Sequence, residues 1–139
     1  MESKGEEFVS VVVLYDSVKR VVLLQKRDSN VIGGNKWAFF GGRNEGTENP
    51  IETLAREVKE EIGLSVDVDK LKMLYEYVPK PPLFYRYVFT LPLSSDAVVH
   101  LMEGQSYGWI PYEDIEKTDL TDTTRQDLRK FLETFSNKN

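Results

Sequence analysis

Three glutamates, Glu57, Glu60 and Glu61, stand at positions i, i+3 and i+4 of a segment whose pattern predicts an α-helix. On a helix this spacing brings the three carboxylates onto one side. Like charges at such short range repel one another, and a hard divalent cation with oxygen ligands offsets that repulsion. Mg²⁺ paired with substrate phosphates is the usual case. The alternative is an ordinary solvated acidic face, which many helices carry.

The helix that carries these glutamates is predicted to run from Pro50 to Ile62. Asn49 is a favourable N-cap, and Glu52, three residues later, completes a capping box. Proline suits the first helical position, and Gly63 is a suitable stop. We expect an apolar stripe to face the core. Its members are Ile51, Leu54, Ala55, Val58 and Ile62.

The fixed positions around this helix read Gly42-x5-Glu48-x7-Arg56-Glu57-Val58-x-Glu60-Glu61-x-Gly63-Leu64. A pattern with this many fixed positions is rarely met by accident. The segment Gly42 to Leu64 resembles the complete signature of the Nudix hydrolases, which cleave the diphosphate of nucleoside diphosphates linked to another group. Within that signature, metal binding is favoured over a solvated acidic face. Gly42, Glu48, Arg56 and Gly63 are interpreted as structural residues of the signature, with Glu48 and Arg56 forming an ion pair.

A second match lies outside the signature, in Glu103-Gly104-Gln105 followed by Trp109. It resembles the MutT-like branch of the family. The resemblance implies that Glu103 joins Glu57, Glu60 and Glu61 as a catalytic residue, either as a metal ligand or as the general base. The alternative for Glu103 is an exposed loop carboxylate. The backbone carbonyl of Gly41 is implied as a further metal ligand, and the implied cofactor is Mg²⁺, with Mn²⁺ able to substitute.

The same resemblance implies substrate contacts. Lys26 and Arg27, at the end of the second predicted strand, and Arg43, after the double glycine, match residues that bind phosphate in the family. Arginine suits this role because its planar fork binds phosphate through two donors. Aromatic side chains are candidates for stacking on a base, with core or cross-strand packing as the alternative. They are Phe39, Tyr77 and Tyr85.

The chain departs from the family pattern at two places. Phe40 precedes the double glycine where most members have proline, which alters the approach to the metal loop. The segment Asp119 to Thr124 lacks the asparagine with which the oxidised-guanine enzyme of the branch recognises its base, although Asp122 offers a carboxylate for a guanine edge. The base specificity therefore stays open at this stage.

We expect a Mg²⁺-dependent pyrophosphohydrolase that cleaves the diphosphate linkage of a nucleoside triphosphate or a related nucleotide, including oxidised or non-standard ones. One alternative is a pyrophosphatase of nucleotide sugars or ADP-ribose with the same fold. Another is a non-hydrolysing Nudix domain that binds a nucleotide as a sensor. The intact signature argues against the sensor, because non-hydrolysing domains commonly lose one of its carboxylates.

The whole chain, residues 1–139, fits a single domain. A net charge of −5 argues against a DNA or RNA partner, so the expected partner is a small-molecule nucleotide. The absence of cysteine excludes disulfides and thiolate chemistry. Without a signal-like or membrane-spanning run, we expect a cytoplasmic monomer or homodimer that does not contact membranes. The single histidine, His100, lies among apolar neighbours and is interpreted as structural.

Strands and helices alternate in a way that predicts an α+β protein. The resemblance implies the Nudix fold, an α/β/α sandwich around mixed β-sheets. The turn-like residues 16–20 predict a hairpin between the first two strands, and Thr121 is a plausible N-cap for a final helix. The predicted strands are Phe8 to Tyr15, Val21 to Arg27, Trp37 to Phe40, Leu71 to Val78, Phe84 to Leu93 and Gly108 to Ile110, and a helical turn is predicted at Pro111 to Ile115.

Overall fold

The computed structural model describes residues 6–27, 34–80, 84–101 and 106–136. Within these ranges the strands are β1 (Phe8–Asp16), β2 (Val21–Lys26), β3 (Trp37–Ala38), β4 (Phe40–Arg43), β5 (Lys72–Tyr77), β6 (Tyr85–Pro92) and β7 (Ser106–Pro111). The helices are α1 (Pro50–Ile62), the 3₁₀ helix η1 (Tyr112–Lys117) and α2 (Asp122–Ser136). No helix in the described ranges has the length and apolar character needed to cross a membrane.

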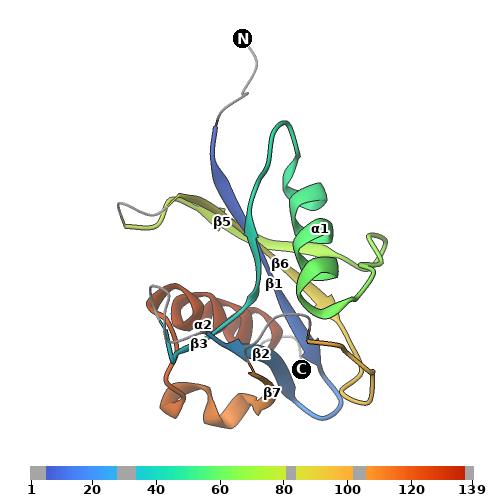
Figure 1. The fold of residues 1–139 in the computed structure, drawn as a ribbon. Helices are drawn as coiled ribbons and strands as arrows, with labels where there is room; N and C mark the ends of the chain where they lie inside the picture. Colours follow the sequence, from blue (N-terminus) through green and yellow to red (C-terminus); the bar gives the residue numbers. More distant parts are fainter. Residues whose placement is uncertain (1–5, 28–33, 81–83, 102–105, 137–139) are drawn as a thin grey trace.

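Strand β1 lies at the centre of a mixed sheet (Figure 1). From Phe8 to Tyr15 it runs parallel to β6, and on its other side it is antiparallel to two strands. The first half of β1 pairs with β4, and the last part pairs with β2, which in turn pairs with β3 and β7. This arrangement confirms the predicted hairpin and places β4 beside the middle of the sheet.

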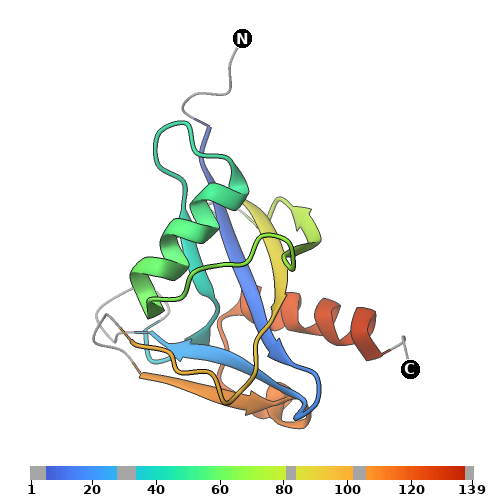
Figure 2. The same ribbon diagram turned by 90° about the vertical axis from the view of Figure 1, so that its right-hand side faces the viewer.

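Helices α1 and α2 cover opposite faces of the sheet (Figure 2). One cluster of buried side chains joins α1 to the sheet through Leu54, Val58 and Ile62. A second cluster joins α2 to the other face through Leu128 and Phe131. Because successive side chains of a strand point to opposite faces, the central strands supply both clusters. The predicted α/β/α sandwich around a mixed sheet is confirmed.

Helix α1 has the predicted bounds and caps. The side chain of Asn49 accepts a hydrogen bond from the backbone of Glu52, whose own side chain accepts from the Asn49 backbone, so the capping box is present. Gly63 ends the helix in the left-handed conformation, at φ 69°. One part of the predicted stripe is wrong: Ile51 is 43% exposed, while Thr53 is fully buried. The buried hydroxyl of Thr53 donates to Glu48 Oε1 at 2.9 Å, which satisfies a polar group on the inner side of the helix.

The strand predicted at Trp37 to Phe40 is divided in the structure. Residues of β3 pair with β2, whereas β4 begins at Phe40, after the single residue Phe39, and pairs with β1. Both glycines of the double glycine lie inside β4, with Gly41 opposite Val11 and Gly42 opposite Ser10. The double glycine is therefore part of the sheet, and the predicted loop begins after it.

Candidate active site

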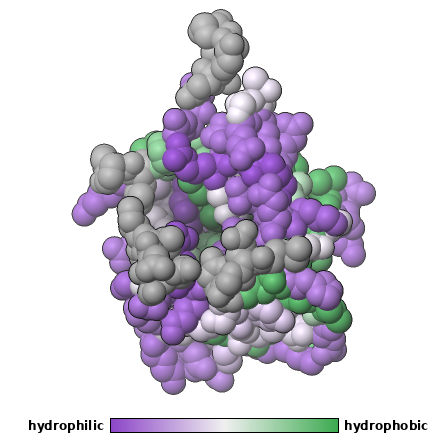
Figure 3. Space-filling view, in the orientation of Figure 1, coloured by the Kyte–Doolittle hydropathy of each residue, from purple (hydrophilic) through white to green (hydrophobic). Residues whose placement is uncertain are grey.

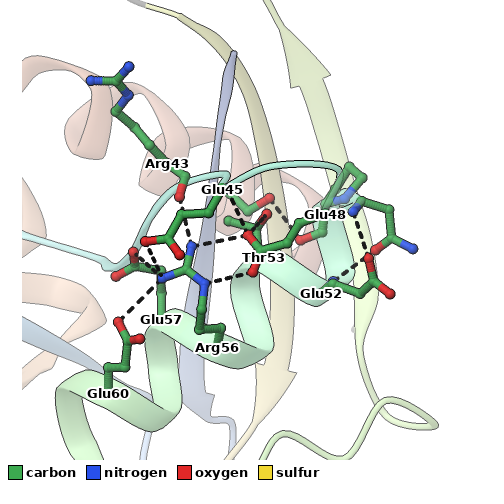
Figure 4. Close-up of polar contacts among 11 residues, drawn as sticks. Arg43, Glu45, Glu48, Glu52, Thr53, Arg56, Glu57 and Glu60 are labelled. Atoms are coloured by element: carbon green, nitrogen blue, oxygen red, sulfur yellow. Dashed lines mark hydrogen bonds and ion pairs between the residues drawn. The ribbon is translucent and has the colours of Figure 1, made fainter. Parts of the chain in front are cut away.

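Arg56 organises the signature segment at the start of α1 (Figure 4). Its Nε lies 2.7 Å from Glu48 Oε2, and its Nη2 donates to Glu48 Oε1 at 3.1 Å. The same Nη2 donates to the carbonyl oxygen of Arg43 at 2.9 Å, which ties the end of β4 to the helix. The hydrogen bonds from Arg56 hold the pKa of Glu48 at about 2. The expected Glu48–Arg56 ion pair is present and fixes the loop against α1.

Two of the three helix glutamates lie against the double glycine. A Cβ atom on Gly42 would lie 2.5 Å from Cδ of Glu57, so only glycine leaves room for this carboxylate. Glu61 Oε1 accepts a hydrogen bond of 3.0 Å from the backbone N–H of Gly41. Burial raises the pKa of Glu57. The fold thus places the carboxylates of Glu57 and Glu61 against neighbouring residues of β4, which pairs with the central strand β1.

Glu60, the third glutamate, is more exposed and faces Arg56, whose Nη1 also contacts Glu57. In the described part of the chain, no three acidic or histidine side chains already surround one metal-sized position. The donor set nevertheless suits a hard cation, because it consists of carboxylate oxygens from one helix together with the backbone of β4. A cation here would also offset the burial that raises the pKa of Glu57.

A cavity of about 530 Å³ opens beside the double glycine. Its lining includes residues of β4, the cations Arg27 and Arg43, and the first residues of α2. Figure 3 shows that the outer surface over α1 is hydrophilic. The lining residues are Val9, Val11, Arg27, Ala38, Phe39, Gly41, Gly42, Arg43, Arg86, Thr121, Asp122, Thr123 and Thr124. This cavity is large enough for a nucleotide.

Arg43 has protein partners at the edge of this cavity. Its Nη2 forms an ion pair with Glu7, and its guanidinium lies 4.3 Å from the ring centroid of Phe84. Figure 4 shows the guanidinium pointing away from the Arg56 cluster. The side chain is more than half exposed, at 58%. A phosphate reaching Arg43 would therefore compete with a surface carboxylate, which is a weak competitor in water.

The other predicted substrate residues differ in position. Phe39 is 4% exposed and belongs to the core cluster against α2, yet it also lines the cavity. Lys26 is exposed at the end of β2, opposite Trp37, and does not line the cavity. Tyr85 donates to Glu76 at 2.7 Å and packs on Tyr87, on the opposite side of β6 from the cavity. Tyr85 thus makes a cross-strand hydrogen bond to β5 and packs on a ring of its own strand.

Two further predictions concern single residues. Glu103 lies outside the described residues, so its role as a catalytic residue or metal ligand stays a prediction. The side chain of His100 is exposed, and its backbone N–H donates to the carbonyl oxygen of Ile62 at the end of α1. The hydrogen bond uses only the backbone of His100, so the structural interpretation of its side chain stays a prediction.

Sequence reasoning missed a buried polar network next to the cavity. Arg86 on β6 donates through Nε to Asp127 Oδ2 at 2.7 Å, and Asp127 is fully buried on α2. Tyr75 and Tyr77 donate to the other carboxylate oxygen, at 2.7 and 2.9 Å. Tyr77 therefore holds Asp127 and does not line the cavity. The available signal was a charge in each of two apolar patterns: Arg86 alternates with Val88, and Asp127 precedes Leu128 in the helix stripe.

Comparison with known proteins decides the family. The profile of the NUDIX domain matches residues 7–135, almost the whole chain. This chain belongs to the Nudix family. Members of the family hydrolyse pyrophosphate bonds and use divalent metal ions, so this Nudix protein is a hydrolase of that class.

Individual relatives agree with this assignment. The nucleoside triphosphatase NudI of Escherichia coli is 27% identical over 119 residues, which cover 78% of this Nudix chain and 84% of NudI. The MutT protein from Methanosarcina mazei Go1 superposes with a TM-score of 0.74 at 22% identity, over 100% of both chains. The NUDIX domain of Shewanella oneidensis NrtR, solved in complex with ADP ribose, gives a TM-score of 0.74 at 17% identity, over 97% of this chain and 90% of that one. The predicted MutT-like Nudix fold is confirmed.

Proposed function

We propose that this Nudix hydrolase is a Mg²⁺-dependent pyrophosphohydrolase that cleaves the diphosphate linkage of a nucleoside triphosphate. One observation carries the proposal: the carboxylates of Glu57 and Glu61 lie against Gly42 and Gly41, and those glycines line a nucleotide-sized cavity. The cation Arg43 lines the same cavity. The proposed metal ligands thus contact two glycines of the cavity lining, to which the proposed phosphate-binding cation also belongs.

In this proposal Glu57, Glu60 and Glu61 hold the metal, and the carbonyl of Gly41 adds a ligand from β4. A bound Mg²⁺ supplies positive charge for the diphosphate oxygens and lowers the pKa of a coordinated water. Arg56 keeps the loop and helix in register, and Gly42 leaves space for the Glu57 carboxylate. The motif assigns Glu103 as a further ligand or as the general base.

The cations at the cavity are assigned to the substrate. Arg27 and Arg43 bind the phosphates, because a guanidinium matches the geometry of phosphate oxygens. Phe39 lines the same cavity and offers one ring for a base. Lys26 stays a weaker candidate, since its side chain is exposed outside the lining. The triphosphate is favoured because the relative NudI is named a nucleoside triphosphatase.

The second candidate is an ADP-ribose ligand, either hydrolysed or only sensed. It is favoured by the likeness to the NUDIX domain of NrtR that was solved with ADP ribose. The intact set of carboxylates, Glu57, Glu60 and Glu61, favours hydrolysis over sensing.

The experiment is a hydrolysis screen with Mg²⁺ over nucleoside triphosphates, nucleotide sugars and ADP-ribose. Glu61→Gln is the main variant, because glutamine can still accept the hydrogen bond from Gly41 while its charge is gone. We expect a loss in turnover of about 10²–10³ or more with unchanged thermal unfolding. Glu133→Gln, at an exposed glutamate of α2, is the matched control and should keep full activity. Near-normal turnover of Glu61→Gln at saturating Mg²⁺ would contradict the metal assignment.

A parallel variant tests the residue assigned by motif alone. Glu103→Gln should lower turnover strongly and leave stability almost unchanged, since a transition-state interaction acts on kcat. If Glu103 is an exposed loop carboxylate, its replacement should leave turnover unchanged. The free energy of unfolding should then change by no more than about 0.5 kcal/mol. Full activity in this variant would remove Glu103 from the site and leave the base among the helix glutamates.

A further inference from the structure

Arg86 is a buried cation that lines the proposed nucleotide cavity. Only 9% of the residue is exposed. Its Nε donates to Asp127 Oδ2 at 2.7 Å, and Tyr75 and Tyr77 complete the shell of Asp127 from β5. Because Asp127 is held by three donors on two strands, it fixes the guanidinium of Arg86 from the Nε side. The network is hydrogen-bonded on both oxygens of Asp127, and it lies between the sheet and α2.

The two terminal NH₂ groups of Arg86 form the other side of the guanidinium. Across the described ranges, the only hydrogen bond of the Arg86 side chain to protein is the one through Nε. Buried donors without partners are costly, by roughly 1–3 kcal/mol for each group, and native proteins seldom retain them without a use. Because Arg86 lines the cavity, a ligand bound there is able to accept hydrogen bonds from these NH₂ groups.

The charge of this donor pair points to a neutral partner. Asp127 already neutralises Arg86 at 2.7 Å, so the site presents directed N–H groups and little net charge. The cations assigned to phosphate, Arg27 and Arg43, line the cavity together with Gly41 and Gly42. A nucleotide whose phosphates bind Arg27 and Arg43 leaves the rest of the lining, which contains Arg86 and the residues 121–124, for its base.

We propose that Arg86 is the specificity residue of the base subsite, and that it binds a base edge with two adjacent hydrogen-bond acceptors. This inference rests on the proposed nucleotide substrate. Guanine offers such an edge in O6 and N7, and cytosine offers one in N3 and O2. Adenine places an amino donor beside each acceptor of its exposed edge, and thymine and uracil place N3–H there. Oxidation of guanine at C8 adds a hydrogen to N7 and removes one of the two acceptors.

Asp122 complements this selection. It lines the same cavity with an exposed carboxylate, which accepts hydrogen bonds and donates none. In guanine the N1–H and the 2-amino group lie next to O6, and in cytosine the 4-amino group lies next to N3. Each base thus presents donors beside its acceptor pair, which suits an arginine and an aspartate in one pocket. The substrate class is a canonical guanine or cytosine nucleotide.

The test compares kcat/KM for dGTP, dCTP, dATP, dTTP, 7-deaza-dGTP and 8-oxo-dGTP, with Mg²⁺. The native enzyme should prefer dGTP or dCTP over dATP and dTTP by about 5- to 150-fold, the range for one bidentate contact. If the enzyme prefers dGTP, that preference should vanish with 7-deaza-dGTP and with 8-oxo-dGTP. If it prefers cytosine, kcat/KM should be high for dCTP alone. Equal rates on all bases, or a preference for dATP, dTTP or 8-oxo-dGTP, would overturn the inference.

Arg86→Gln should reduce the preference to within about threefold. Because that change leaves Asp127 buried without its cation, the double variant Arg86→Gln with Asp127→Asn removes both charges and preserves folding if the single variant unfolds. Arg129→Gln is the matched control, since Arg129 pairs with Glu116 on the exposed side of α2 and should leave the preference unchanged. A preference that persists in the Arg86 variants assigns the network to packing alone and refutes the inference.

A binding measurement separates this inference from the proposed function. Titration calorimetry with GMP, CMP, AMP and UMP reads base selection without hydrolysis. Selective binding of GMP or CMP that Arg86→Gln or the double variant abolishes, with no triphosphate hydrolysed, would support the base subsite and refute the proposed reaction. Hydrolysis of every triphosphate together with equal binding of the four monophosphates would support the reaction and refute the subsite.

Discussion

Gly41→Ala and Gly42→Ala are adjacent substitutions that we expect to fail for different reasons. At Gly41 the backbone has φ 140°, and an added Cβ would lie 2.1 Å from the carbonyl oxygen of Ser10 and 2.7 Å from Cα of Val11. Both atoms belong to the backbone of β1, the central strand. At Gly42 the added Cβ would meet the carboxyl group of Glu57, at 2.5–2.8 Å. That group is the end of a side chain and is able to rotate away.

The two contacts lead to different magnitudes. Alanine in the backbone region of Gly41 costs roughly 1–3 kcal/mol in strain alone, and displacement of β1 adds to it, so we expect a loss of at least about 3 kcal/mol. This is a large part of a total stability of roughly 5–15 kcal/mol. Gly42→Ala should cost about 1 kcal/mol, because Glu57 relieves the overlap. Its turnover should fall by about 10²–10³, since the proposed ligand is displaced.

Urea unfolding followed by circular dichroism, together with kcat at saturating Mg²⁺, measures both effects. Gly46→Ala is the control: its φ is 56° and nothing lies within 4 Å of the added Cβ, so it should cost roughly 1–2 kcal/mol and leave kcat unchanged. Normal turnover in Gly42→Ala would refute the placement of Glu57 at the reaction site. Equal destabilisation of the Gly41 and Gly42 variants would refute the distinction between a backbone and a side-chain neighbour.

Three further predictions concern ionisable groups. Arg56 lowers the pKa of Glu48 to about 2, so the pair stabilises the fold fully above about pH 4.5 and this stabilisation should be lost as the pH falls toward 2. Glu48→Gln should reduce the loss of unfolding free energy over that pH range, as measured by urea titrations. Burial raises the pKa of Tyr77 to about 12, so its contribution to the free energy of unfolding is complete below about pH 10 and should be lost as the pH rises toward 12. Tyr77→Phe should reduce this loss of stability at high pH. Glu7→Gln should lower KM by up to about fivefold, because substrate phosphate no longer has to displace the Glu7 carboxylate from Arg43. An unchanged KM would argue against Arg43 as a phosphate contact.

Much of the site could be predicted from the sequence because it depends on residues that are close together in the chain. The capping box at Asn49 and the stop at Gly63 are decided by residues within one helical turn, and both are present as predicted. The spacing of Glu57, Glu60 and Glu61 at i, i+3 and i+4 places them on one side of α1 by helix geometry alone. The pairing of Glu48 with Arg56 joins the loop to its own helix, and it forms with an Nε–Oε2 distance of 2.7 Å.

Strand pairing and long-range contacts were decided by the tertiary structure. Residues 37–43 read as one strand followed by a loop, but the pairing of Trp37 with β2 and of Phe40 with β1 divides them, because β1 passes from one neighbour to the other along its length. Ile51 has helical spacing for burial, yet it stays 43% exposed, whereas Thr53, a polar residue two positions later, is fully buried.

The base end of the cavity depended on tertiary structure most of all. Arg86 and Asp127 are 41 residues apart, and each looks like an isolated charge in an apolar pattern. They become a pair only because α2 packs across the face of the sheet that holds β5 and β6. Sequence spacing reports which residues share one element, whereas the packing of two elements depends on the shape of the whole core. The sequence therefore determined the family and the metal-binding helix, and only the fold brought a buried arginine to the nucleotide cavity.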